Sequence, residues 1–184
     1  MTTQFNRFVF CGTLLLFSAT NARSEGPFCQ FQVPPLQSFT NSPDPTNPTF
    51  LLDLAACLEL PSGTPLVMNG IGWNLLVQAI GDSWISEAEI HFTDPGNPQD
   101  SGLRVNPGFF FPDSNDNQPT PLFLGMLKLE FLGLDPLFLS TGLVRLEFGE
   151  SFDNGPGPDT EWLEGALFVQ AIPPCTRGDV NCDQ

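Results

Sequence analysis

Three stretches of this chain alternate between apolar and polar residues, and this pattern restricts the fold more than any other feature. A period of two places alternate side chains on opposite faces of a strand, so each stretch predicts an antiparallel strand with one buried face and one solvated face. The residues predicted to face the core are Ala88, Ile90, Phe92, Leu127, Leu129, Phe131, Val144, Leu146 and Phe148. Those predicted to face solvent are Glu87, Glu89, His91, Lys128, Glu130, Arg145 and Glu147.

The apolar runs are short, and turn residues separate them. With 19 Pro and 17 Gly the chain opposes long helices. These features predict an all-β fold, an antiparallel two-sheet β-sandwich that is jelly-roll-like, over residues 50–173. Residues 51–58 fit either a strand or one or two helical turns, and the Pro-rich residues 23–49 are expected to form an extended lead-in. The runs span residues 50–60, 68–80, 84–92, 122–131, 143–148 and 163–172.

The first 22 residues have the pattern of a secretory signal peptide. Arg7 supplies a positive charge, residues 8–17 form an apolar run too short to cross a bilayer, and small residues lead to a cleavage site after Ala22. We therefore expect a secreted or cell-surface protein with no membrane insertion. The formal net charge is −15, which argues against nucleic acid and anionic membranes as partners because both attract basic patches.

Export makes disulfides plausible for the cysteines beyond the signal peptide. Four such cysteines allow three pairings. The pairing expected here is Cys29 with Cys57 and Cys175 with Cys182, because each pair sits near one end of the chain.

Two loops have the composition of a calcium site. Residues 153–159 and residues 113–117 both combine oxygen-bearing side chains with turn residues. Residues 153–159 also contain glycines, which permit tight carbonyl geometry. The same residues are equally suited to turns without a metal. The candidate calcium ligands in these loops are Asp153, Asn154, Asp159, Asp113 and Asn115.

The C-terminal residues 174–184 contain the first half of a calcium loop. Asp179, Asn181 and Asp183 occupy the first, third and fifth positions of an EF-hand-type loop, and the positions that complete it do not follow. The run GDVNCD, residues 178–183, resembles the opening of a type I dockerin repeat in secreted proteins of planctomycete-like bacteria. A dockerin binds calcium and docks on a cohesin. Because both dockerin helices and the second loop are missing, this tail is interpreted as truncated, and cohesin docking is not expected.

Residues 71–92 and 143–170 together resemble an uncharacterised β-sandwich domain of secreted bacterial proteins. That resemblance implies an exported module of unknown activity and names no catalytic residue. The matching residues are Gly72, Trp73, Gly81, Ser83, Trp84, Ser86, Glu87, Ala88, Glu150, Ser151, Phe152, Asp153 and Trp162.

Few residues suit catalysis. Glu87 and Glu150 are candidates for a glycosidase-like pair of carboxylates, with a solvated strand face as the plainer interpretation. His91 is expected on a strand surface. The tryptophans offer stacking platforms for sugars if exposed, but the expectation for Trp84 and Trp162 is the core.

The leading hypothesis is a secreted or cell-surface, non-enzymatic module that binds polysaccharide or a surface protein, with calcium as the candidate cofactor. The alternatives are a carbohydrate-active enzyme and a structural envelope or matrix protein.

Overall fold

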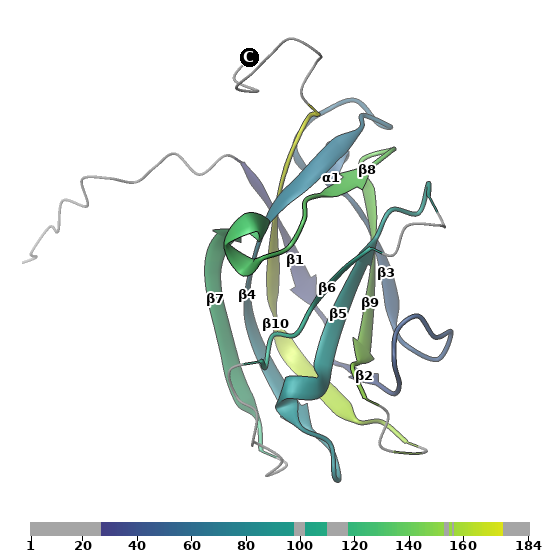
Figure 1. Cartoon of the computed structure of the whole chain (residues 1–184), viewed down its shortest axis with the longest axis vertical. Helices are drawn as coiled ribbons and strands as arrows, with labels where there is room; N and C mark the ends of the chain where they lie inside the picture. The colour runs from purple at the N-terminus through teal and green to yellow at the C-terminus, as the bar shows by residue number, and fades with distance from the viewer. Residues whose placement is uncertain (1–26, 98–101, 110–117, 153–154, 156, 175–184) are drawn as a thin grey trace, which may run out of the picture.

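The computed structural model of the protein describes residues 27–97, 102–109, 118–152, 155 and 157–174. Within these ranges the strands form two antiparallel sheets that face each other (Figure 1). The predicted two-sheet β-sandwich is confirmed. In the described part of the chain, no helix has the length and apolar character needed to cross a membrane.

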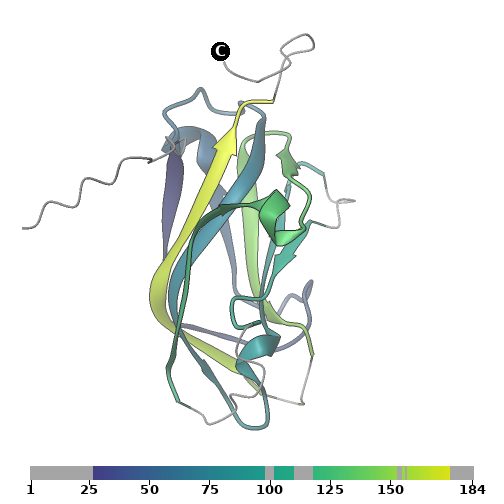
Figure 2. The same ribbon diagram turned by 60° about the vertical axis from the view of Figure 1, so that its left-hand side comes forward.

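The larger sheet has six described strands. Four follow the order β1-β10-β4-β7, and two short strands complete it, because β2 pairs with β10 and β8 pairs with β4. Figure 2 shows how β10 bends along its length, which accompanies the register shifts in its pairing with β4. The strands of this sheet are β1 (Phe28–Val33), β2 (Leu36–Ser38), β4 (Leu66–Ala79), β7 (Thr120–Lys128), β8 (Leu137–Leu139) and β10 (Thr160–Ile172).

The smaller sheet has four strands in the order β3-β9-β5-β6. The strands are β3 (Thr49–Asp53), β5 (Ala88–Thr93), β6 (Leu103–Val105) and β9 (Leu143–Glu150), and the short helical turns are α1 (Leu54–Cys57), η1 (Ile85–Glu87) and η2 (Leu129–Leu132). In the described residues, two of these turns, α1 and η1, connect strands of the two sheets, and a third, η2, connects β7 to β8 within the larger sheet.

The expected lead-in at residues 23–49 was wrong in part, because two strands of the larger sheet lie inside it. β1 pairs with β10 from Phe28↔Gln170 to Val33↔Gly165, and β2 pairs with the other end of β10. The alternation in FCQFQV is the signal for β1, since Cys29 and Val33 are buried while Gln30 and Gln32 are exposed.

The ambiguous run at residues 51–58 contains both a strand and a helical turn. β3 ends at Asp53, whose carboxylate caps α1 by accepting a hydrogen bond from the backbone N–H of Ala56 at 2.8 Å. An N-cap carboxylate satisfies one of the unpaired N–H groups of the first turn, so Asp53 marks the point where the strand stops.

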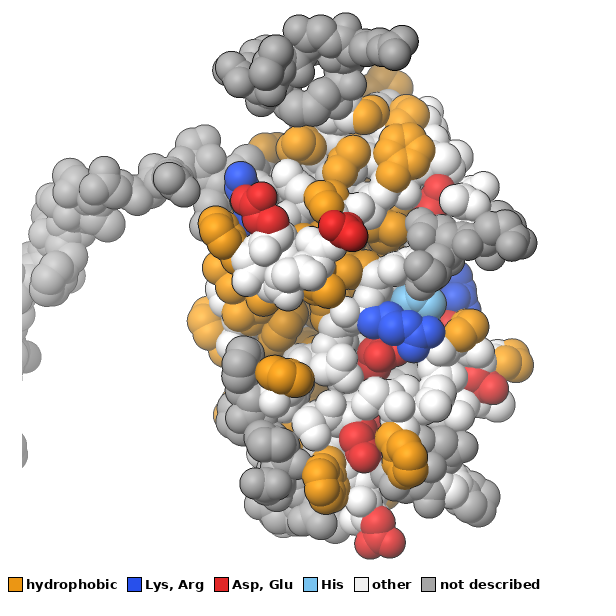
Figure 3. Space-filling view, viewed as in Figure 1, with side chains coloured by type: hydrophobic (Ala, Val, Ile, Leu, Met, Phe, Trp, Pro, Cys, Tyr) orange, Lys and Arg blue, Asp and Glu red, His pale blue; other side chains and the backbone are white. Residues whose placement is uncertain are grey.

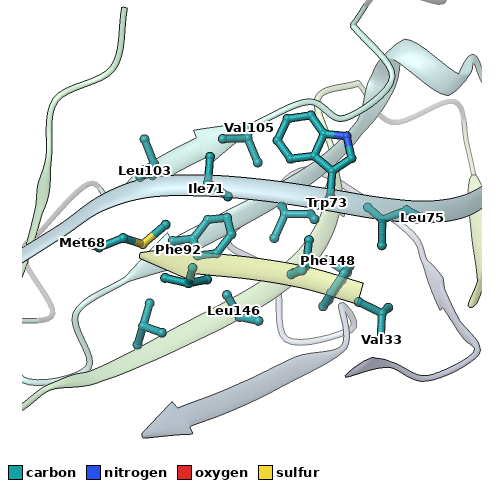
Figure 4. Close-up of a cluster of buried hydrophobic side chains, with 14 of the residues drawn as sticks. Val33, Met68, Ile71, Trp73, Leu75, Phe92, Leu103, Val105, Leu146 and Phe148 are labelled. Carbon is teal, nitrogen blue, oxygen red and sulfur yellow. The ribbon is translucent and has the colours of Figure 1, made fainter. Parts of the chain in front are cut away.

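The core lies between the sheets and is built from the apolar members of the alternating runs. Figure 4 shows Met68 and Ile71 of β4 beside Phe92 of β5 and Leu146 of β9. Aromatic rings link strands across the sandwich, since the ring centroids of Phe148 and Trp162 are 4.9 Å apart and their planes meet at 77°. Such edge-to-face pairs stabilise beyond the area they bury.

The core prediction failed at the end of β7. Leu127 and Phe131 were expected to face the core, yet they are 36% and 68% exposed. The strand ends at Lys128, and the helical turn η2 then rotates Leu129 inward and Phe131 outward. Gly133, in the left-handed region at φ 71°, terminates this turn.

The predicted disulfide between Cys29 and Cys57 is confirmed. It joins β1 of the larger sheet to α1, which directly follows β3 of the smaller sheet. The cross-link therefore fastens the two sheets together along one side of the sandwich. The second expected pair, Cys175 with Cys182, lies outside the described residues.

Candidate functional site

The outer face of the smaller sheet carries charged side chains that are buried. Glu89 and His91 on β5 and Glu147 on β9 are 5%, 4% and 0% exposed. The alternation places them on this outer face, but the prediction that they meet solvent was wrong. The reason is a segment that we call the strap, residues 39–48, which bonds across these side chains and excludes water from them.

Glu147 is the centre of this network. Its Oε1 accepts hydrogen bonds from the backbone N–H of Asp44 at 2.7 Å and from the amide of Asn47 at 3.2 Å. The guanidinium of Arg145 lies 2.9 Å from Oε2 as an ion pair, although the two groups are not aligned as a hydrogen bond. Burial on its own raises the pKa of Glu147, but the hydrogen bonds from the strap and the charge of Arg145 outweigh it and leave the pKa below its ordinary value.

Arg104 on β6 links the strap to the smaller sheet, because it bonds to one residue of each. Its guanidinium donates to Oε1 of Glu89 at 2.7 Å and to the backbone carbonyl of Ser42 at 2.7 Å. Burial raises the pKa of Glu89, and the charge and hydrogen bond of Arg104 oppose that shift only in part.

Ser42 and His91 in this network are the residue types that form a nucleophile and its base in some catalytic sites. The hydroxyl oxygen of Ser42 lies 3.3 Å from Nδ1 of His91. A serine beside an imidazole is part of such a site only when the hydroxyl reaches substrate. Ser42 is 6% exposed, and its hydroxyl also bonds to Glu147. The geometry therefore supports a structural role for Ser42, which holds the strap against the smaller sheet.

The predicted carboxylate pair is brought into one neighbourhood, but only one member is near the surface. Ala88, next to Glu87, is the cross-strand partner of Glu150. The carboxylate of Glu87 accepts from the backbone N–H of Trp84 at 2.9 Å. Glu150 is fully buried, and its pKa is raised to about 8, first by burial and further by the charges of Asp159 and Glu87. A carboxyl group without access to solvent does not reach a glycosidic bond, so this pair lacks the open cleft of a glycosidase.

Of the predicted calcium ligands, only Asp159 lies among the described residues. Asp159 is 6% exposed and, with Asp82, Gly155 and Gly157, lines a hollow of about 180 Å³. Among the described residues there is no group of three or more acidic, histidine or cysteine side chains placed to hold a metal. The remaining predicted ligands lie outside the described residues, and calcium at these loops stays a prediction. They are Asp153, Asn154, Asp113, Asn115, Asp179, Asn181 and Asp183.

The three tryptophans occupy three different environments. Trp162 is 1% exposed, as predicted, whereas Trp84 is 44% exposed and the expectation of a core position was wrong. Strand β5 begins only at Ala88, and the turn η1 precedes it, so Trp84 does not share the alternation of the strand. Trp73 is 6% exposed, at the margin of the core.

The outer face of the larger sheet contains a polar hollow of about 400 Å³. Gln32, Asn74 and Glu164 line it, each from a different strand, and its apolar lining includes Leu76 and Pro121. The strand pairing explains their proximity, because Gln32 and Asn74 both pair with Ala166 of β10, from opposite sides. A register shift between Trp162 and Glu164 creates the space beside them.

Gln32, Ala166 and Asn74 form a cross-strand row, and an exposed aromatic ring on β7 continues it. Phe123 on β7 is the cross-strand partner of Asn74 and is 75% exposed. The row therefore runs from Gln32 through Ala166 and Asn74 to Phe123 across four strands. None of these residues was predicted as functional from the sequence. A usable signal was present, since Asn74 interrupts an otherwise apolar run and Phe123 stands out of phase with the inward-facing Leu122.

Neither a known protein family nor a curated protein matches this sequence.

Proposed function

We propose that this protein is an exported, non-enzymatic β-sandwich module that binds polysaccharide on the outer face of its larger sheet. The signal-peptide pattern supports export. The single observation that carries the proposal is the hollow formed by Gln32, Asn74 and Glu164 beside the exposed ring of Phe123.

The polar groups in the hollow suit a sugar. A side-chain amide offers both a carbonyl acceptor and N–H donors, and neighbouring sugar hydroxyls need both kinds of partner. Gln32 and Asn74 supply two such amides, and Glu164 supplies an acceptor. The strands hold these three groups on a rigid sheet, so little ordering is needed when a ligand binds.

The ring of Phe123 is the second part of the proposed site. A phenylalanine that is 75% exposed in the middle of a strand contributes little to the core. An apolar ring face beside amides matches the alternating C–H and hydroxyl surfaces of a pyranose ring. The carboxylate of Glu164 and the net charge of −15 favour a neutral polysaccharide over an acidic one.

A microarray of neutral and acidic polysaccharides tests the proposal, with affinity electrophoresis to measure the strength of binding. We expect binding to a neutral polysaccharide that Asn74→Ala weakens by about threefold to tenfold, because one or two hydrogen bonds are lost. Phe123→Ala is expected to weaken it by about tenfold. Leu51→Ala is the matched control, since Leu51 is equally an exposed apolar side chain but lies on the other sheet, 59% exposed.

Two results would overturn this assignment. One is the absence of binding across the array by a folded protein. The other is polysaccharide binding that Asn74→Ala and Phe123→Ala leave unchanged, which would place the sugar elsewhere on the molecule.

A further inference from the structure

A separate, more apolar groove lies between the edge strands of the two sheets. It opens where β6 of the smaller sheet faces β7 and η2 of the larger one, and its volume is about 430 Å³. In Figure 3, hydrophobic side chains gather on the side of β7 and η2, and basic side chains and the histidine lie to the right of centre, with acidic side chains against them. The lining residues that matter here are Trp73, Arg104, Asn106, Phe109, Leu124 and Phe131.

Two exposed rings flank this groove from different walls. Phe109 follows β6 and Phe131 belongs to η2, and each is 68% exposed. Leu124, inward-facing on β7, supplies apolar surface between the walls. A concave apolar surface of this size falls in the range that binds small organic molecules, about 300–1,000 Å³.

The groove also contains a hydrogen-bond donor without a partner. Trp73 is 6% exposed and contributes to the lining, yet its indole N–H donates to no atom of the described residues. The contrast is Trp162, whose indole N–H donates to Ser38. The indole nitrogen of Trp73 is not one of the enclosed polar atoms that lack a partner among the described residues, so its N–H is open to water and to a ligand oxygen in the groove.

Arg104 lines the same groove, and its positive charge is paired with the carboxylate of Glu89. Of the five N–H groups of a guanidinium, Arg104 uses one on Glu89 and another on the carbonyl of Ser42. Its side chain remains 42% exposed. The two contacts fix its orientation, and further N–H groups are available to an anionic oxygen.

We propose that this groove binds a small amphipathic molecule with an apolar, preferably aromatic, body and an anionic oxygen head group. The body lies between Phe109 and Phe131, the head group accepts hydrogen bonds from Arg104, and the indole N–H of Trp73 donates to a ligand oxygen on the groove wall. This site is independent of the polysaccharide hollow, because Leu124 and Phe123 point to opposite faces of β7.

Two fluorescent probes of matched shape test the proposal on the full chain. 8-Anilinonaphthalene-1-sulfonate is an anionic aromatic molecule, and N-phenyl-1-naphthylamine is its uncharged analogue. A net charge of −15 repels the anionic probe everywhere except near a local positive group. We therefore expect saturable binding of one molecule of either probe, with the anionic probe bound about tenfold more tightly.

Variants separate the parts of the site. Phe131→Ala and Phe109→Ala are expected to weaken both probes by about tenfold. Arg104→Gln should remove the preference for the anionic probe while the neutral probe still binds, which also shows that the groove is intact. Trp73→Phe keeps an aromatic ring, although a smaller one, removes the N–H donor and should weaken the anionic probe by about threefold to tenfold. Phe138→Ala, an exposed ring on β8 outside the groove, is the control.

The proposal is overturned by any of three results in protein whose thermal melt remains cooperative. These are non-saturable probe fluorescence, probe binding that neither phenylalanine variant changes, and a preference for the anionic probe that survives in Arg104→Gln.

Discussion

The indole N–H of Trp162 donates a hydrogen bond to the hydroxyl oxygen of Ser38 across 3.0 Å, joining β10 to the end of β2 inside the core. The hydroxyl of Ser38 in turn donates to the carboxyl group of Glu150 at the end of β9. Three strands from both sheets therefore meet in one chain of buried hydrogen bonds. The carboxyl group of Glu150 ends this chain and is fully buried.

Glu150 should make the stability of the protein fall as the pH rises. Its pKa is raised from 4.5 to about 8 in the folded protein, so the folded state holds a proton that the unfolded state releases. The stabilisation is complete below pH 4.5 and is lost as the pH rises through about 8. Each unit of pKa difference corresponds to about 1.4 kcal/mol. Urea unfolding across this pH range measures the slope.

Glu150→Gln supplies the control for that prediction. Glutamine has nearly the same shape and stays neutral, so the variant should lose most of the pH dependence and be more stable than the native protein near pH 9. A native protein whose unfolding free energy is flat from pH 5 to pH 8 would show that Glu150 is ionised when folded.

Asn47→Ala should loosen the strap. The Asn47 carbonyl accepts from the backbone N–H groups of Phe39 and Thr40, and its amide donates to Thr40 and Glu147. Removing these bonds leaves buried groups unpaired, at a cost of about 2–3 kcal/mol in the free energy of unfolding. Hydrogen exchange should quicken at the Asp44 N–H, which donates to Glu147. Thr46→Ala is the matched control, because the described side-chain and backbone bonds of Thr46 go only to the half-buried Asp44.

Replacing both Cys29 and Cys57 with serine should lower the free energy of unfolding by about 3–4 kcal/mol. The two cysteines are 28 residues apart, and closing a loop of that length removes this much chain entropy from the unfolded state. Chemical denaturation of the double variant measures the loss. A double variant as stable as the native protein would show that the packing of β1 on β10 is sufficient without the cross-link.

The tryptophans should respond to truncation according to their burial. Trp162→Ala removes a fully buried ring that packs on Phe148 and bonds to Ser38, at an expected cost of about 3–5 kcal/mol. Trp84→Ala should change stability by less than about 1 kcal/mol, because Trp84 is 44% exposed. Thermal melts of the two variants compare them directly, and equal losses would contradict this difference.

Alternation predicted the central strands well because their periodicity is local. β5 and β9 bury Ile90, Phe92, Val144, Leu146 and Phe148 as expected. The prediction failed where tertiary contacts override the pattern. Thus η2 turns Phe131 outward, and the strap covers His91. A strap formed some 50 residues before the strand it covers leaves no periodic trace in either segment.

The candidate binding surfaces were harder to predict than the core. Gln32, Asn74 and Glu164 are separated by many residues and meet only through the pairing of three strands. The order of strands in a sheet depends on long-range contacts that a single sequence does not specify. The proposed roles of Phe123 and Trp73 depend on the exposure of Phe123 and on the surroundings of the Trp73 N–H. Neither can be read from the sequence.

The pairing of β1 with β10 also determines how the sandwich bears mechanical load. Phe28 at the start of β1 lies opposite Gln170 near the end of β10, so these two strand ends lie at the same end of the sandwich. Tension that pulls them apart peels β1 away one residue pair at a time. The disulfide at Cys29 stops this peeling after the first pair and passes the force to Cys57. The one described disulfide therefore lies where it resists the separation of β1 from β10.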